Sequence, residues 1–412
     1  MIEQLGRAQL ARLARENMLS AHFNSRTGYA ALQMNHGESA YEPVAIENWM
    51  ASSPVYTQRM QQAMKLRGTS SVETIFKGMQ LEVGLAHQYF DARFEMTGVE
   101  EGQFWLNSCG PLLEVEPRGD DAVRTMCHSI EDPTFDATAM ATNPRARVRP
   151  VHRPPRVPGD RTPHCLWRVF VDESAEALIE TEITARMRNT ALANLPIVRG
   201  NNNEPGGMDY YDGPLLEQMQ LEVFSQSALA AICREIAIQN HLLINSLWWA
   251  IADRYTEDAA DAVATFQMEG ACWMMSERLC SSLGLEGNGL EAMERVVNLH
   301  PAFQPQDYWN LQVELRDDEN LHIALAPTPD SAEDEMRGWS RLLRNGEIAG
   351  LLGLVRGVNP RASVEADADG YLVKLEASAE PAEDPLSVQI ARGSVLYKTQ
   401  LQDHIQLLEV SG

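Results

Sequence analysis

Two histidines at matching places in similar stretches of the chain are the first candidates for chemistry. His22 ends the stretch RENMLSAH and His241 ends REIAIQNH. Imidazole can act as a general base or a metal ligand, although a buried histidine that bonds a carbonyl can also be purely structural. The next helical region after His22 supplies an acid, Glu47, in AIENW. We therefore expect His22 and Glu47 to form a catalytic pair or to share a metal ion.

Three cysteines and one histidine follow in a single later region of the chain. They are Cys109, Cys127, His152 and Cys165. Nitrogen and sulfur ligands suit a tetrahedral zinc ion, so we predict a metal site here, with zinc as the first candidate and iron as the second. A closed set of four ligands would make the metal structural, whereas an open position would let it activate water.

Two other interpretations of these cysteines stay open. Free cysteine is often a buried apolar residue, and Cys127 beside His128 could be a reactive thiolate. No Cys-x-x-Cys pair occurs, so the spacing is not that of a zinc finger. The cysteines of the later half fall in predicted helices instead, which favours a joint role for the earlier group. These later residues are Cys233, Cys272 and Cys280.

Arginines alternate along the stretch NPRARVRPVHRPPR. In a strand Arg145, Arg147 and Arg149 share one face, and guanidinium groups bind carboxylates through paired hydrogen bonds. We predict that Arg145 and Arg147 bind a small anionic substrate. The alternative is an exposed strand whose arginines pair with surplus carboxylates. Nucleic acid is not expected, because no aromatic residues are interleaved with the arginines.

The chain repeats itself in order. Without a gap, the twenty residues from Glu3 to His22 match those from Glu222 to His241 at six positions. Further on, FWLNSCGPLLEVEP resembles YWNLQVELRDDE, NPRARV returns as NPRASV, and HCLWRVFV matches GYLVKLEA. We predict a tandem duplication, because chance similarity between helices does not explain later matches in the same order. The first copy spans 1–195, a linker rich in Asn and Gly spans 196–214, and a degenerate second copy spans 215–412.

Each copy reads as helices followed by strands, which predicts an α+β fold with an antiparallel sheet. We expect helices over 9–23, 56–68, 71–95, 257–284 and 289–299, and a closing helix over 395–409. Strands are expected over 104–117, 145–152, 165–172 and 370–378, with a hairpin over 308–327 that turns near 317–320.

The composition restricts the class of protein. The chain has 412 residues, six cysteines and a formal net charge of −24. So acidic a chain repels nucleic acid and anionic membranes, and its sparse cysteines suit a reducing compartment. Neither a signal peptide nor an apolar run of membrane-spanning length is recognisable. We expect a cytoplasmic protein that does not bind membranes, and a homo-oligomer stays open.

Several stretches together resemble one family. WLNSCGPLLEV, CHSIEDPTFDATA, NPRARVR and GDRTPHCLWRVFV look like the C-terminal part of the L-2-amino-thiazoline-4-carboxylic acid hydrolase-like proteins, and SAHFNSRTGYAAL resembles their histidine-bearing helix. By this resemblance Cys109, Cys127 and Cys165 match family cysteines, and His152 falls near the remaining one. The second copy resembles the family in its helices and lacks the strand cysteines.

The resemblance implies a small-molecule hydrolase. It would open a C–N or C–S bond in a small carboxylated, amino-acid-like substrate, at a site in the first copy. Two alternatives are a non-catalytic ligand-binding or partner protein and a redox enzyme whose metal is held by histidine and glutamate.

Overall fold

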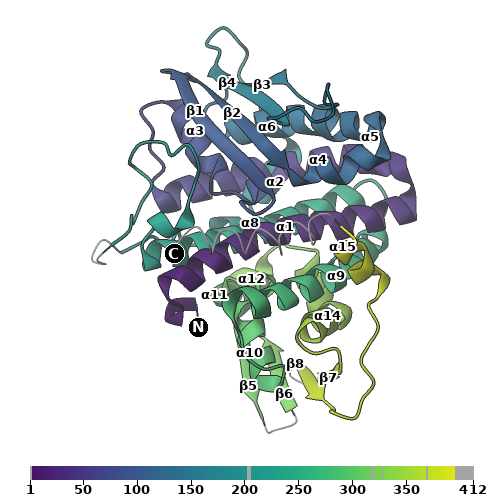
Figure 1. Cartoon of the computed structure of the whole chain (residues 1–412). Coiled ribbons are helices and arrows are strands. Elements are labelled where there is room, and N and C mark those ends of the chain that lie inside the picture. The colour runs from purple at the N-terminus through teal and green to yellow at the C-terminus, as the bar shows by residue number, and fades with distance from the viewer. Residues whose placement is uncertain (1, 202–205, 317–319, 327, 368–369, 395–412) are drawn as a thin grey trace.

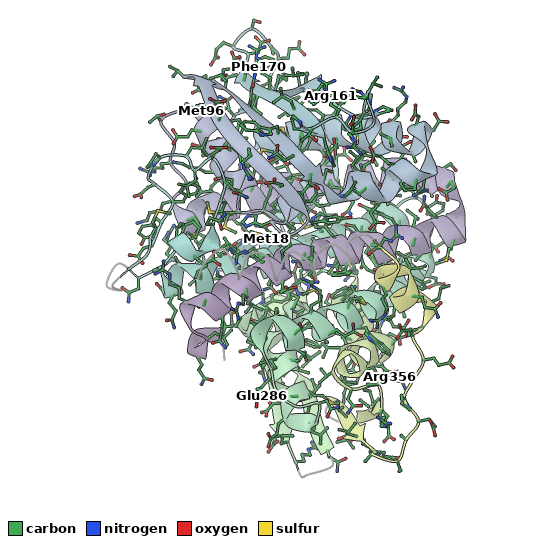
Figure 2. The ribbon with its side chains drawn as sticks, in the orientation of Figure 1. Met18, Met96, Arg161, Phe170, Glu286 and Arg356 are labelled. Atoms are coloured by element: carbon green, nitrogen blue, oxygen red, sulfur yellow. The ribbon has the colours of Figure 1, made fainter. Side chains whose placement is uncertain are left out.

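Two long helices lie in the middle of the molecule and separate its two sheets (Figure 1). The computed structural model describes residues 2–201, 206–316, 320–326, 328–367 and 370–394. Helices α1 (Arg7–His36) and α8 (Gln226–Ala252) run through the middle. In Figure 2, Met18 of α1 lies between Phe170 in the first sheet and Glu286 on the side of the second sheet. The predicted α+β class with antiparallel sheets is confirmed.

The long helices pack across the halves of the chain. Helix α1 packs mainly on α9 (Glu257–Leu283) and α8, whereas α2 (Tyr41–Met64) packs mainly on α8. Contacts between α1 and α2 themselves are few. The apolar faces of the first two helices are therefore buried largely by the second half of the chain, and this burial is the main source of helix stability in proteins.

Two buried ion pairs join the halves at equivalent places. Arg59 on α2 pairs with Glu235 on α8 at 2.9 Å, and Arg278 on α9 pairs with Glu16 on α1 at 2.5 Å. The same interval along the chain separates Glu16 from Glu235 as separates Arg59 from Arg278. Each pair therefore links the first helix of one half to the second helix of the other.

The two sheets have the same strand order. With the strands of each half numbered along the chain, the order from one edge of the sheet to the other is first, second, fourth, third. The first sheet runs β1 (Phe90–Gly98), β2 (Glu101–Cys109), β4 (Cys165–Val171), β3 (Ala146–His152). The second sheet runs β5 (Leu311–Leu315), β6 (Asn320–Leu325), β8 (Gly370–Leu375), β7 (Ala362–Asp367).

The repeated NPR motif makes the same turn before β3 and β7. The amide of Arg145 donates to Asn143 Oδ1 at 2.9 Å, and that of Arg361 donates to Asn359 Oδ1 at 3.0 Å. Asparagine favours such turns because its side chain replaces a backbone acceptor. By strand order, however, β2 corresponds to β6, so the predicted match of FWLNSC with YWNLQV is one strand out of step.

Shorter helices connect these elements. They are α3 (Ser71–Met79), α4 (Gly110–Val115), α5 (Asp120–Arg124), a π-helix (Thr125–Ile130), α6 (Glu131–Met140), α7 (Glu182–Arg188), α10 (Leu290–Leu299), α11 (Gln306–Trp309), α12 (Pro329–Glu333), α13 (Trp339–Arg344), α14 (Ala349–Val358) and α15 (Leu386–Arg392).

Two predicted elements extend far beyond the ends of the observed ones. The helix expected to reach residue 95 ends at Met79, because Phe94 pairs with Phe104 in the sheet and tertiary pairing outweighs helix propensity. The strand expected to reach residue 117 ends at Cys109. Helix α4 begins directly after it, and Pro111 lies in the first turn of this helix, a position that proline favours. The helix predicted over 395–409 and the turn at 317–319 lie outside the described residues.

Part of the predicted linker is packed into the core. Tyr211 is fully buried, and its hydroxyl donates to Gln80 Oε1 and accepts from the Leu216 amide, both at 2.8 Å. This part of 196–214 is therefore tied to the first half. Across the described ranges, none of the helices combines the length and apolarity that a membrane crossing needs.

Candidate active site

A cavity of about 250 Å³ lies in the first half, between α1 and α2 on one side and the segment 106–138 on the other. Helix α1 contributes His22, and two acids, Glu82 and Glu131, also line the wall. Seven of the other lining residues are aromatic. These rings belong to Tyr29, Tyr41, Trp49, Tyr56, Tyr89, Phe90 and Phe135.

His22 is held as a neutral ring. Its Nε2 donates to the carbonyl of Val83 at 2.9 Å, and the rings of Tyr89 and Phe90 lie 5.0 and 5.3 Å away. Burial lowers the pKa of His22 to about 4, although the bond to Val83 opposes this shift. With the proton on Nε2, Nδ1 is the acceptor of the neutral ring, and the low pKa makes it a hydrogen-bond acceptor and not a strong base at neutral pH.

Glu82 is a buried acid directly before the residue that binds His22. Its side chain is 4% exposed, and the Thr57 hydroxyl donates to its Oε2 at 3.3 Å. Burial raises the pKa of Glu82 to about 7, and the bond from Thr57 only partly offsets this rise. Glu82 can therefore exchange a proton near neutral pH.

Glu131 begins α6 at the opposite wall and is half-buried. Its pKa is raised to about 8, chiefly by burial, with Arg153 opposing and Asp132 adding to the shift. The nearby guanidinium of Arg153 is bonded to Asp132. Glu131 is thus mostly protonated at pH 7 and can donate a proton.

Two arginines also line the cavity, each paired with an acid. Arg26 lies 3.5 Å from Glu114, and Arg118 lies 3.1 Å from Glu38. The Arg118–Glu38 pair is largely exposed, so its mutual attraction is weak and can be exchanged for a ligand carboxylate.

The other acid and the arginines predicted from the sequence lie elsewhere. Glu47 is on α2 but pairs with Arg254, just beyond the end of α8, and does not line the cavity. Arg145 is exposed beside the edge strand β3, and Arg147 donates to the carbonyls of Pro144 and Glu176. His22 is therefore brought to the cavity without Glu47, Arg145 or Arg147.

The three predicted cysteine ligands gather behind the cavity wall as buried thiols. Burial raises the pKa of each thiol, to about 12 for Cys165 and further for Cys109 and Cys127, and nearby Glu131 adds to all three shifts. Cys109 and Cys165 also raise the pKa of Cys127. At neutral pH they are protonated, which disfavours the reactive-thiolate interpretation.

His152 does not join these cysteines. It pairs with Leu166 across the β3–β4 ladder and so shares the face of Leu166, whereas the adjacent Cys165 points to the other face. No group of three His, Cys, Asp or Glu side chains that could hold a metal ion is found among the described residues. The predicted set of Cys109, Cys127, His152 and Cys165 therefore does not fit a zinc site as it is arranged.

Sequence reasoning missed both cavity acids. Glu82 falls between Leu81 and Val83 as a single acid in an apolar run, whereas Glu131 follows Ile130 and is followed by a second acid, Asp132. An isolated acid within an apolar run is the signal that could have found Glu82, since such acids are buried only at an energetic cost. Glu131 lay in a stretch for which no helix was predicted.

The second histidine, His241, has backbone and ring partners like those of His22, with an indole beside it. His241 donates to the Pro301 carbonyl at 3.1 Å and contacts the Trp309 ring at 5.2 Å, which repeats the surroundings of His22. Trp339, 2% exposed, lies against His241, and its Nε1 donates to Gln267 at 3.0 Å. An indole thus occupies the space beside the second histidine.

No protein-family model, curated protein or solved structure matches this chain.

Proposed function

We propose that the first half is a small-molecule enzyme and that the cavity of His22, Glu82 and Glu131 is its active site. The observation that carries this proposal is a pair of acids in one cavity, Glu82 buried and Glu131 half-buried, with pKa values of about 7 and 8. Acid–base catalysis is most efficient when the pKa of the catalytic group lies near the working pH. Structural acids are usually paired or exposed instead.

The proposed reaction is hydrolysis of a C–N or C–S bond in a small carboxylated, amino-acid-like substrate. Arg26 or Arg118 binds the substrate carboxylate. Ionised Glu82 takes a proton from water, whose oxygen attacks the carbon, and Nδ1 of His22 accepts a hydrogen bond that orients this water. Protonated Glu131 gives its proton to the departing nitrogen or sulfur as the bond breaks. The reaction class follows from the family resemblance, and the residues follow from the cavity.

We also propose that the halves arose by tandem duplication and that the second half mainly supports the first. The repeated strand order, the two NPR turns and the reciprocal ion pairs support this origin. The two histidines with their carbonyl partners add to it. The indole of Trp339 beside His241 supports the loss of a site from the second half.

A substrate panel tests the function. Amino-acid derivatives with cyclic and acyclic C–N and C–S bonds are incubated with the protein, and hydrolysis is followed by mass spectrometry. Glu131→Gln and Glu82→Gln should each lower kcat/KM by about 10²–10⁴. Glu47→Gln is the matched control, because Glu47 lies outside the cavity, and it should retain activity. Full activity in both cavity variants, with unchanged melting temperatures, would refute the assignment.

A further inference from the structure

We infer that the cavity binds an organic cation, a protonated or quaternary amine, between its aromatic rings and its two acids, Glu82 and Glu131. As a statement about the substrate this rests on the proposed function, but cation binding can be measured without turnover.

Two of the acids that line the cavity have no cation bonded to them. Glu82 accepts a hydrogen bond from the Thr57 hydroxyl, and Arg153, whose charge only partly opposes the raised pKa of Glu131, donates to Asp132. Neither Glu82 nor Glu131 has an ion-pair partner in the described part of the chain. A ligand that brings a positive charge would therefore stabilise both carboxylates in a site where burial now disfavours their ionised forms.

Each arginine at the wall is paired with an acid other than Glu82 and Glu131. Arg26 is paired with Glu114, and Arg118 is paired with Glu38. The ring of His22 is neutral, since its Nε2 donates to a backbone carbonyl and burial disfavours the charged form. The positive charge that the two acids lack is therefore best supplied by the ligand.

The rings of the wall suit a cation. Tyr29 and Tyr41 meet edge to face with centroids 5.2 Å apart, and Tyr89 meets Phe90 in the same way at 5.3 Å. Aromatic faces attract ammonium groups, most strongly where water is excluded. A volume of about 250 Å³ accommodates a small amine. Aromatic rings combined with acids select a cation over a neutral molecule of the same shape.

A pair of isosteric probes tests this selection. Choline and 3,3-dimethylbutan-1-ol have nearly the same shape, and only choline is charged. In calorimetric titrations at pH 8, choline should bind the wild-type chain at least about tenfold more tightly than the alcohol. Glu131→Gln should reduce that preference by about tenfold without changing the affinity for the alcohol, and Glu47→Gln should leave both affinities unchanged.

The outcomes separate the two proposals. Equal binding of both probes, or binding of neither, overturns cation recognition, whatever the hydrolysis assay shows. Preferential binding of choline without any hydrolysis of the panel supports cation recognition and refutes the enzyme, leaving a ligand-binding protein. Equal loss of both probes in Glu131→Gln, with a lowered melting temperature, is a folding defect. Glu82→Gln then repeats the comparison from the other wall.

Discussion

At the scale of single residues, the buried acids make stability depend on pH. The ordinary pKa of a glutamate is 4.5, and burial raises that of Glu82 to about 7 and that of Glu131 to about 8. The folded chain therefore binds more protons than the unfolded chain between these values. The contribution of both acids to stability is full below pH 4.5 and is lost as the pH rises through 7 and 8.

This prediction is measured by chemical unfolding between pH 6.5 and 9, above the range in which the buried histidines lose their contribution. The free energy of unfolding should fall across this range by a few kcal/mol at most, since one pKa unit corresponds to about 1.4 kcal/mol. Glu131→Gln should flatten the decline over this range. An unchanged slope in the variant would contradict the raised pKa of Glu131.

The buried histidines act in the opposite direction. Burial lowers the pKa of His22 from 6.5 to about 4, so its contribution is present above pH 6.5 and is lost as the pH falls toward 4. His87, His241 and His300 shift the same way. Stability should therefore also fall below about pH 6, and His22→Gln should weaken that fall when unfolding is measured below that pH.

The sequence identified the histidine of the candidate site and missed its acids, for a physical reason. His22 repeats with the helix that carries it, and helical periodicity is a local pattern. Glu82 and Glu131 come from a short 3₁₀ connection and a helix start that only tertiary packing brings together. Glu47 is nearer to His22 along the chain than either acid is, but its side of α2 faces Arg254.

At the scale of elements, the reciprocal ion pairs hold the four long helices together. Arg59 and Glu235 expose only 6% and 1% of their side chains, so removing one partner strands a buried charge. Arg59→Ala should lower the free energy of unfolding by about 3–5 kcal/mol. In the same urea titrations Lys374→Ala, which removes the exposed pair with Glu365, should cost about 1 kcal/mol or less. Equal losses would contradict the burial argument.

Helix α14 lies so close to α9 that glycine is required between them. A Cβ on Gly353 would lie 2.4 Å from the carbonyl of Glu269. Gly353→Ala should therefore destabilise the chain by about 1–3 kcal/mol, although alanine normally favours a helix. Gly78→Ala in α3 is the control, since its Cβ would meet Thr57 at 3.6 Å, and it should be neutral or stabilising. Thermal melts compare the two variants.

Elements with a strong local pattern were predicted well. The predicted end of the helix over 257–284 is confirmed, since Gly284 caps α9 in a left-handed conformation. The strands β3, β4 and β8 lie within the ranges predicted for them. The strand β1 was mistaken for helix because the turn directly before it, at 87–89, contains no Gly, Pro, Asn or Asp to signal it. Its pairing with β2 is a long-range contact that periodicity does not reveal.

At the scale of the whole molecule, the halves should depend on each other to fold. Because α1 and α2 bury their apolar faces against α8 and α9, residues 1–214 alone would expose a large apolar surface. Expressed separately, each half should aggregate or stay unfolded, and co-expressed halves should purify together through a tag on one of them. A first half that is monomeric and melts cooperatively by itself would refute this dependence.

Under the duplication that we propose, the indole of Trp339 beside His241 closed one of two equivalent sites. In a dimer of identical subunits every substitution occurs twice, so a residue that closes one chamber also closes its twin. A chain that carries both versions can block one chamber and keep the other open. Because both halves belong to one chain, they are always made in a one-to-one ratio. The half with the blocked chamber can therefore serve as a scaffold, and every open half still has a partner.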